Sequence, residues 1–385
     1  MAGPLKGARI IEIAGIGPGP FACMLLADMG AEVIRIDRTA GGMSMGANPA
    51  DVMGRGRKSI AVDLKHPDGA GVVLDLIETA DALVEGFRPG VMEKLGLGPD
   101  VCLERNPKLV FGRMTGWGQE GTLAHAAGHD INYIAITGAL DAIGRRDSGP
   151  VPPLNLLGDF GGGAMYLVMG LLAAMLEAKT SGKGQVVDAA ISDGVISLMA
   201  AMQGFKGMGM WEVGERQNNM LDGGAHYYDT YECSDGKYIC IGSIEPQFYM
   251  QLAEILGVDI GEAGFHMQTD KSLWSEYKPV VIDAFKQKAR AEWCELMEGT
   301  DICFAPVLDM DEAPQHAHNL ARGSFIERDG IVQTAPAPRF SRTASEVQGS
   351  PVAAGQNTAE VLASLGRSAA DIDVMLESGV VGANQ

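Results

Sequence analysis

Apolar and polar stretches alternate at the start of the chain in a way that predicts a strand, a helix and a second strand. Residues 9–14 are mostly apolar and predict a buried strand, and residues 15–20 form a turn rich in glycine and proline. Residues 21–29 predict a helix that ends at Gly30, and residues 31–37 predict the second strand. This order is typical of a parallel sheet with helices packed on its faces.

The same pattern continues through the first half of the chain. Further short strands are expected at residues 60–64, 82–85, 109–114 and 185–188, and helices at residues 70–78 and 161–178. The sequence therefore predicts a large α/β domain.

The pattern changes near residue 225. Two β-rich runs, residues 227–233 and 237–242, are joined by a Ser-Asp-Gly turn, which is a hairpin signal, and helices are expected to follow. We therefore predict a large domain of residues 1–190 completed by residues 330–385, linkers at residues 191–224 and 321–329, and a smaller α+β domain of residues 225–320.

Composition and charge narrow the classes of function. The 385 residues are 46% hydrophobic, and 30 basic against 49 acidic residues give a net charge of −19, which argues against a nucleic-acid-binding surface. The cysteines form no C-x-x-C pair and the histidines show no ligand spacing, so we expect reduced thiols, no metal site and a cytoplasmic location. The start of the chain does not resemble a signal peptide, and the apolar run at residues 164–176 is shorter than a bilayer span.

The turn at residues 15–20 lies where a dinucleotide-binding loop would lie. Asp37 ends the next strand, at the place of an acid that would bind a ribose. The spacing is G-x-G-x-G-P rather than G-x-G-x-x-G, however, and Pro18 and Pro20 each remove a backbone N–H that would hold a pyrophosphate. An NAD-dependent oxidoreductase is therefore disfavoured, and a tight turn with proline at the helix start is the plainer interpretation.

Basic residues gather in the first hundred positions of this acidic chain. A cationic groove for phosphates is one interpretation, and a solvated surface is the other. The residues concerned are Arg38, Arg55, Arg57, Lys58, Lys65, Arg88 and Lys94.

The centre of the chain holds the most informative polar residues. His129 and Asp130 stand in the run GHDINY at residues 128–133, and Asp159 follows further along. Asp159 directly precedes the helix predicted at residues 161–178, so it is a candidate N-cap. The alternative is a reactive carboxylate whose pKa is raised by burial among apolar residues. The pattern alone leaves both interpretations open.

These motifs together resemble the family III CoA-transferase superfamily, and within it the enzymes that racemise acyl-CoA thioesters. The resemblance rests on GHDxNY at residues 128–133, PPLN at 152–155 and GDFGGG at 158–163, with supporting stretches at 57–65, 115–119, 182–188 and 228–233. It implies a Rossmann-like large domain that binds CoA, a smaller α+β domain, and two chains wound into an interlocked homodimer.

The resemblance also implies a reaction. The α-carbon of a 2-methyl-branched acyl-CoA thioester would be inverted by 1,1-proton transfer through an enolate, with His129 and Asp159 as the two acid/bases. Asp130 would place its backbone N–H near the thioester oxygen, and Asn155 and Tyr133 would lie close to the reacting atoms. No cofactor is expected, because coenzyme A enters as part of the substrate.

Further site residues follow from the same resemblance. Glu245 of the partner subunit would reach His129 and hold the tautomer of its imidazole. The expected CoA contacts are Ile16 and Arg38 at the adenine, Arg88 and Lys94 at the phosphates, and Ala61, Val62 and Lys65 along the same groove.

A dense group of methionines lies between the two predicted domains. These residues are either ordinary core packing or a soft surface along which acyl chains of different shape could lie. The group comprises Met199, Met202, Met208, Met210 and Met220.

The main alternative function is a family III CoA-transferase, in which Asp159 would be a nucleophile that forms a mixed anhydride. His129 distinguishes the two, because racemisation needs a second base and the transferases generally lack one at this position. A non-catalytic CoA-binding protein is disfavoured by the combination of His129, Asp130 and Asp159.

Overall fold

The structure is a computed structural model that describes residues 3–40, 46–258 and 266–384. Contacts between residues divide the chain into two compact units. The first comprises Met1–Thr137, Leu154–Leu198 and Leu320–Gln385, and the second comprises Gly138–Pro153 and Met199–Asn319.

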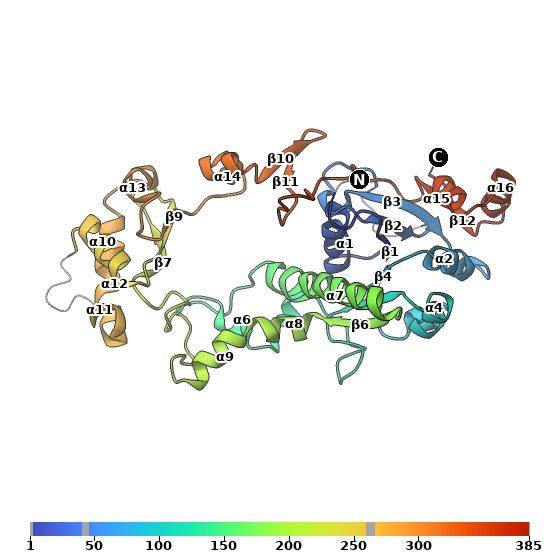
Figure 1. The fold of residues 1–385 in the computed structure, drawn as a ribbon. Helices are drawn as coiled ribbons and strands as arrows, with labels where there is room; N and C mark the ends of the chain where they lie inside the picture. Colours follow the sequence, from blue (N-terminus) through green and yellow to red (C-terminus); the bar gives the residue numbers. More distant parts are fainter. Residues whose placement is uncertain (1–2, 41–45, 259–265, 385) are drawn as a thin grey trace. The chain divides into compact units, whose positions relative to one another are not determined.

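A seven-stranded sheet in the order β12-β3-β2-β1-β4-β5-β6 forms the centre of the first unit (Figure 1). The strands are β1 Arg9–Ile13, β2 Glu32–Asp37, β3 Arg57–Val62, β4 Ala82–Glu85, β5 Val110–Thr115, β6 Gln185–Ala190 and β12 Val381–Gly382. All pairs are parallel except β12 with β3, so the predicted parallel sheet is confirmed. The strand order reverses at β1, and ligands of open α/β sheets bind beyond the carboxyl ends of the strands at such a point.

Helices cover both faces of this sheet. They are α1 Pro18–Asp28, η1 Val52–Gly54, α2 Gly69–Ile77, α3 Val91–Lys94, α4 Pro99–Arg105, α5 Asp130–Ala135, η2 Leu156–Ala164, α7 Met165–Ser181, α8 Ile191–Leu198, α15 Thr358–Ser364 and α16 Ala369–Glu377. Ile11 and Ile13 of β1 pack with α2, α4, α15 and α16 in one buried cluster. On the opposite face Gly112 has no side chain, and Leu167 and Leu171 of α7 pack against its backbone.

The segment η2 is a π-helix that runs directly into α7. Asp159 lies inside this segment, and Asn155 stands at its N-terminus. The interpretation of Asp159 as a simple N-cap is therefore wrong. Such wide turns within helices occur often at functional sites.

One helix in the described part of the chain, Leu156–Ser181, is long and apolar enough to cross a membrane by length and composition alone. It is longer than the apolar run noted in the sequence because η2 and α7 are continuous. In its most apolar window 44% of the residues are buried, and α7 packs against β5 and β6. A core helix of a folded domain meets the same criterion.

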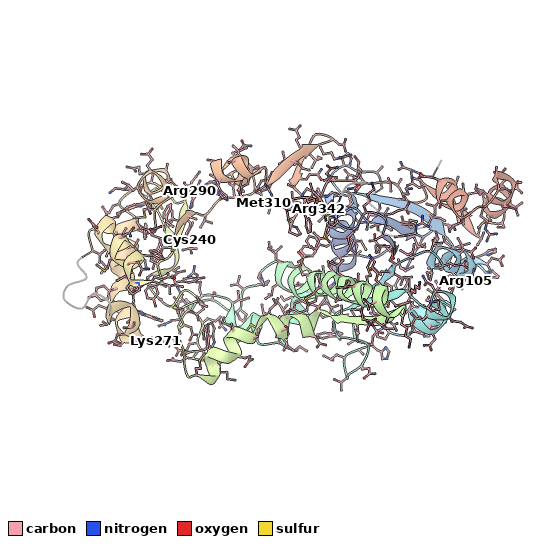
Figure 2. The ribbon with its side chains drawn as sticks, viewed as in Figure 1. Arg105, Cys240, Lys271, Arg290, Met310 and Arg342 are labelled. Carbon is pink, nitrogen blue, oxygen red and sulfur yellow. The ribbon has the colours of Figure 1, made fainter. Side chains whose placement is uncertain are left out.

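The second unit is built on a small antiparallel sheet. Its strands are β7 Tyr228–Glu232, β8 Tyr238–Gly242 and β9 Phe304–Pro306, and its helices are α6 Ala139–Ala142, α9 Ala200–Gly207, α10 Pro246–Leu256, α11 His266–Thr269, α12 Lys271–Phe285, α13 Arg290–Met297 and η3 Ala313–Gln315. Phe285 stacks on Tyr231 and meets Trp293 edge-on, with ring centroids 5.2 Å apart in both pairs. Arg290, labelled in Figure 2, forms an ion pair with Glu312. The helix α14 Ala317–Arg322 crosses the boundary into the first unit, which also holds the hairpin of β10 Phe325–Arg328 and β11 Ile331–Thr334.

The two units differ in detail from the predicted boundaries. Residues 138–153 belong to the second unit, because Arg145 pairs with Asp229 and donates a 2.7 Å hydrogen bond to Thr230. The first unit extends to Leu198, since α8 packs on η2. No local pattern marks either segment, and long-range contacts decide where it lies.

Candidate active site

A cleft of about 750 Å³ opens at the carboxyl ends of β1, β4 and β5 in the first unit. Its walls are the loops that follow these strands, namely residues 13–20, 84–89 and 114–117, together with residues 126–129, Asn132, Tyr133 and Asp159. The cleft therefore lies at the switch point of the sheet. It brings together Ile16, Arg38, Arg88, His129, Tyr133 and Asp159 from the residues predicted from the sequence.

His129 stands at the N-terminus of α5, in extended backbone conformation with φ −131° and ψ 175°. Its backbone N–H donates a 3.0 Å hydrogen bond to the side-chain oxygen of Asn132. The residue is exposed and lines the cleft, so its imidazole is open to a ligand there.

Asp159 is half-buried on the opposite segment η2. Its Oδ2 accepts a 3.2 Å hydrogen bond from the side-chain amide of Asn155. Burial raises the pKa of the Asp159 carboxyl, and the negative charge of Asp130 raises it further. The hydrogen bond from Asn155 and the interaction with His129 lower this pKa but do not cancel the rise. A carboxyl with a raised pKa can both donate and accept a proton nearer neutral pH.

The turn after β1 closes on this carboxylate. Gly17 has φ +69°, and a Cβ built on it would lie 3.2 Å from Asp159 Oδ2. Glycine therefore serves here to let the backbone approach the carboxylate. Pro18 and Pro20 follow in the first turn of α1, as the sequence predicted.

Asp130, the chain neighbour of His129, is buried and bonds the segment that carries Asp159. Its Oδ2 accepts a 2.7 Å hydrogen bond from the backbone N–H of Asp159, and the amide of Gly158 also bonds it. A Cβ at Gly158 would lie 2.3 Å from the same oxygen, so only glycine admits this contact. Burial raises the pKa of the Asp130 carboxyl, which these two backbone bonds counteract.

Tyr133 links several of these groups. Its hydroxyl donates to the carbonyl of Gly128, and its ring meets Trp117 edge-on with centroids 4.8 Å apart. Burial raises the pKa of the Tyr133 hydroxyl, the charge of Asp159 adds to this, and the charge of Arg88 opposes it. Asp159, Arg88 and Tyr133 all line the same cleft.

Two arginines on the cleft are free to meet an anion. Among the described residues, neither Arg38 nor Arg88 forms an ion pair, and both are exposed. Asp37, by contrast, is occupied, because its Oδ2 accepts hydrogen bonds from Arg35 at 2.8 Å and from Ser59 at 2.6 Å. The cleft thus offers positive charge for phosphates but no free acid at the place of a ribose-binding residue.

The other predicted CoA contacts do not line this cleft. Ala61 and Val62 are buried in β3, where they pair with Gly382 and Val381 of β12. Lys65 and Lys94 are exposed elsewhere on the first unit.

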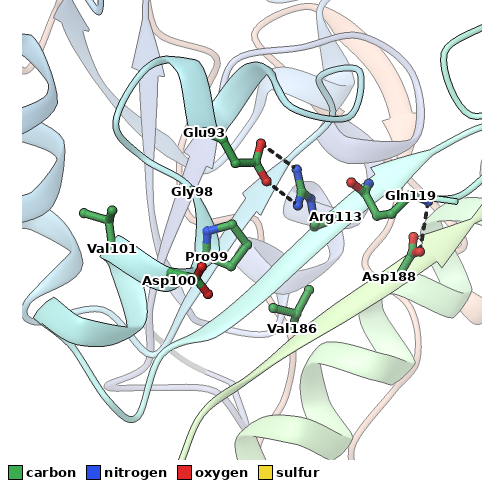
Figure 3. Close-up of a pocket in the computed structure, with 9 residues that line it drawn as sticks. All are labelled: Glu93, Gly98, Pro99, Asp100, Val101, Arg113, Gln119, Val186 and Asp188. Atoms are coloured by element: carbon green, nitrogen blue, oxygen red, sulfur yellow. Dashed lines mark hydrogen bonds and ion pairs between the residues drawn. The ribbon is translucent and has the colours of Figure 1, made fainter.

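A separate pocket of about 680 Å³ in the same unit holds an arginine that is already paired with carboxylates (Figure 3). Its arginine, Arg113, is held by Glu93 at 2.8 Å and by Glu85 at 3.0 Å. Asp188, on the other wall, accepts a 3.0 Å hydrogen bond from the backbone N–H of Gln119. The charge of Arg113 is therefore neutralised, unlike the charges of Arg38 and Arg88.

The remaining predicted residues belong to the second unit. Glu245 is exposed at the N-terminus of α10. Met199 and Met202 line a pocket of about 180 Å³, Met208 and Met210 are exposed, and Met220 packs against the core of that unit. In the described ranges there is no group of three or more His, Cys, Asp and Glu side chains that could hold a metal ion.

Two residues of the site, Asn132 and Gly17, were not predicted from the sequence. Asn132 carries a signal that could have been found, because a side chain three positions after an N-cap residue commonly accepts the N-cap backbone N–H. Gly17 carries no such signal, since its contact with Asp159 joins distant parts of the chain.

Comparison with known proteins identifies the family of this chain. A model of CoA-transferase family III matches residues 5–358, and the chain belongs to this family. It is 42% identical to α-methylacyl-CoA racemase of Mus musculus and 41% identical to that of Homo sapiens, over 99% of this chain and 99% of each relative. The crystal structure of a CAIB/BAIF family protein from Brucella suis matches the fold with a TM-score of 0.81, at 23% identity, over 95% of this chain and 100% of that chain.

Proposed function

We propose that this protein is a racemase that inverts the α-carbon of 2-methyl-branched acyl-CoA thioesters. The observation that carries the proposal is that His129 and Asp159 open onto one cleft with Arg38 and Arg88, which form no ion pair within the described part of the chain. The two relatives at 41% and 42% identity, which carry the name α-methylacyl-CoA racemase, support it.

The reaction needs a base on each side of the α-carbon. One of His129 and Asp159 takes the α-proton, and the electron pair moves into the thioester to give an enolate. The other then returns a proton to the opposite face, so that no atom is gained or lost. The backbone N–H of Asp130, in the first turn of α5, has no carbonyl within its helix to bond and is suited to stabilise the enolate oxygen.

The rest of the substrate would lie along the loops after β1, β2 and β4. Arg38 and Arg88 would bind phosphates of the CoA moiety, and the exposed side chain of Ile16 would pack on its adenine. CoA would enter only as part of the substrate, and the chemistry assigned to His129 and Asp159 needs no further cofactor. The methionines of the second unit would form a soft surface for the acyl chain.

A homodimer belongs to the same proposal. In it, Glu245 of the partner subunit would hold the imidazole of His129 in the tautomer that accepts the proton. The exposed position of Glu245 on its own chain is compatible with this role.

One reaction in D₂O tests the function. Purified protein receives (2R)-2-methyldecanoyl-CoA with no acyl acceptor and no added cofactor, and α-deuterium uptake and the 2S product are followed. We expect uptake together with inversion. The absence of both would overturn the proposal.

The second candidate function is CoA transfer, which the name of the matching family favours. Asp159 would then attack the thioester and form a mixed anhydride while CoA leaves. Transfer of CoA to an added carboxylic acid, without deuterium uptake, would establish this alternative.

A further inference from the structure

The peptide group between Gly128 and His129 has both of its polar atoms bound by side chains. The N–H of His129 donates to the side-chain oxygen of Asn132 at 3.0 Å, and the carbonyl of Gly128 accepts from the hydroxyl of Tyr133. Asn132 and Tyr133 are consecutive residues in the first turns of α5. The helix that follows His129 therefore holds the peptide that precedes it.

The ring of Tyr133 is itself fixed in place. A Cβ built on Gly116 would lie 1.9 Å from a ring carbon of Tyr133, and one on Gly128 would lie 2.7 Å from the same carbon. The phenol thus packs directly on two glycine backbones, and its ring and that of Trp117 meet at nearly a right angle with centroids 4.8 Å apart. This packing of the ring restricts the directions in which the Tyr133 hydroxyl can donate its hydrogen bond.

We infer that Asn132 and Tyr133 are positioning residues that direct the imidazole of His129 toward the α-carbon; this inference rests on the proposed racemase function. Fixing the Gly128–His129 peptide fixes the backbone angles on either side of it, and with them the direction of the Cα–Cβ bond of His129. The constraint matters because Gly128 alone would leave this segment unusually free. A misplacement of about 1 Å can cost a reaction on the order of 100-fold in rate.

In the two-base scheme, a misplaced His129 changes deuterium exchange differently for the two enantiomers, which a general loss of structure would not do. If only His129 is misplaced, Asp159 can still remove the α-proton from one enantiomer. Because His129 cannot deliver a proton to the other face, Asp159 reprotonates the enolate on the original face. In D₂O that enantiomer takes up deuterium with retention of configuration, whereas the other enantiomer, which needs His129 first, takes up none.

The test compares full-length Asn132→Ala with Asn132→Gln and Tyr133→Phe. Glutamine can still reach the N-cap backbone N–H, so Asn132→Gln is the conservative control. We expect Asn132→Ala to lower kcat for inversion about 10- to 100-fold with little change in KM, and to show deuterium uptake with retention from one enantiomer only. Asn132→Gln should restore most of the rate, and Tyr133→Phe should show the same one-sided exchange as Asn132→Ala.

Two results would overturn the inference. One is inversion by Asn132→Ala at the wild-type rate, and the other is an equal loss of exchange from both enantiomers. The wild-type protein is measured in parallel. If it fails to exchange and invert both enantiomers, the proposed function is wrong; if it does both, the variants test the positioning role alone.

Discussion

The carboxylate of Asp130 accepts a 2.7 Å hydrogen bond from the backbone N–H of Asp159. Asp130 is also the chain neighbour of His129, so a single residue connects the two predicted acid/bases. Its side chain bonds the backbone of η2, and its charge contributes to the raised pKa of Asp159. The position of η2 and the protonation of Asp159 therefore depend on a side chain that does not itself line the cleft.

Neutralising Asp130 should shift the pH dependence of the reaction. In the direction in which Asp159 is the base, its carboxyl must be ionised, so the acid limb of the rate profile follows its pKa. Asp130→Asn keeps an acceptor for the Asp159 amide but removes the charge that raises this pKa. We expect the acid limb of kcat/KM to move to lower pH, and an unmoved limb would contradict the electrostatic role.

Removal of either predicted base should abolish inversion. General acid–base groups commonly contribute on the order of 10²- to 10⁴-fold. We expect His129→Ala and Asp159→Ala each to lose at least that factor in kcat, measured by the appearance of the opposite enantiomer. A variant that inverts at full rate would remove its residue from the two-base scheme.

A methyl group at Gly17 should disturb Asp159. The added Cβ would lie 3.2 Å from the carboxylate, and its φ of +69° disfavours any side chain. Gly90→Ala is the control, because Gly90 also precedes a helix at positive φ but no described atom lies within 4 Å of the added Cβ. We expect Gly90→Ala to lose about 1 kcal/mol of stability by thermal unfolding and Gly17→Ala about 1–3 kcal/mol, because ψ is −120° at Gly17 and −2° at Gly90. Only Gly17→Ala should lose activity as well. Equal activity in the two variants would mean that the contact with Asp159 has no consequence.

The buried pair of Arg55 and Asp28 should be important for stability. Both side chains are almost fully buried, and Arg55 also donates to Gln333 at 2.8 Å, which ties the hairpin of β10 and β11 to the end of α1. We expect Arg55→Ala to lower the free energy of unfolding by about 3–5 kcal/mol, since it leaves an uncompensated buried carboxylate.

The control is Arg105→Ala, at a position labelled in Figure 2. Arg105 pairs with Asp75 and Glu78 in an exposed position. Arg105→Ala should cost less than about 1 kcal/mol, with the free energy of unfolding of both variants measured by urea titration. Similar losses in the two variants would contradict the distinction by burial.

Acid should weaken the second unit through His226. This side chain is fully buried, and burial, followed by the charge of Lys278, lowers its pKa to about 4. In the unfolded chain the pKa is about 6.5, so the unfolded state binds the proton more readily between these values. The contribution is complete above about pH 6.5 and is lost as the pH falls toward 4, by about 3 kcal/mol in total. We expect His226→Gln to flatten this part of the stability curve, and an unchanged slope would assign it to other groups.

The parallel sheet and the residues of the cleft could be predicted from sequence for different reasons. The strand at 9–14 and the helix after it follow from the local pattern of apolar residues, so their predicted bounds lie within a few residues of those in the structure. Asp159 was identified by resemblance, but its setting in a π-helix was not, because the carboxylate that bonds its amide comes from the distant Asp130. Ala61 and Val62 were expected at the groove, and the antiparallel pairing with β12, which no local pattern indicates, buries them.

The pairing of β12 with β3 has a consequence for how the molecule is made. Val62 meets Val381, so the sheet that carries the cleft gains its outer strand from the far end of the described chain. The strands of the second unit, residues 228–306, are all synthesised before that strand. During synthesis the second unit can therefore complete its sheet first, while the first unit waits for a distant segment, and such long-range pairings form slowly. The unit that holds His129 and Asp159 can therefore complete its sheet only after the strands of the second unit have been synthesised.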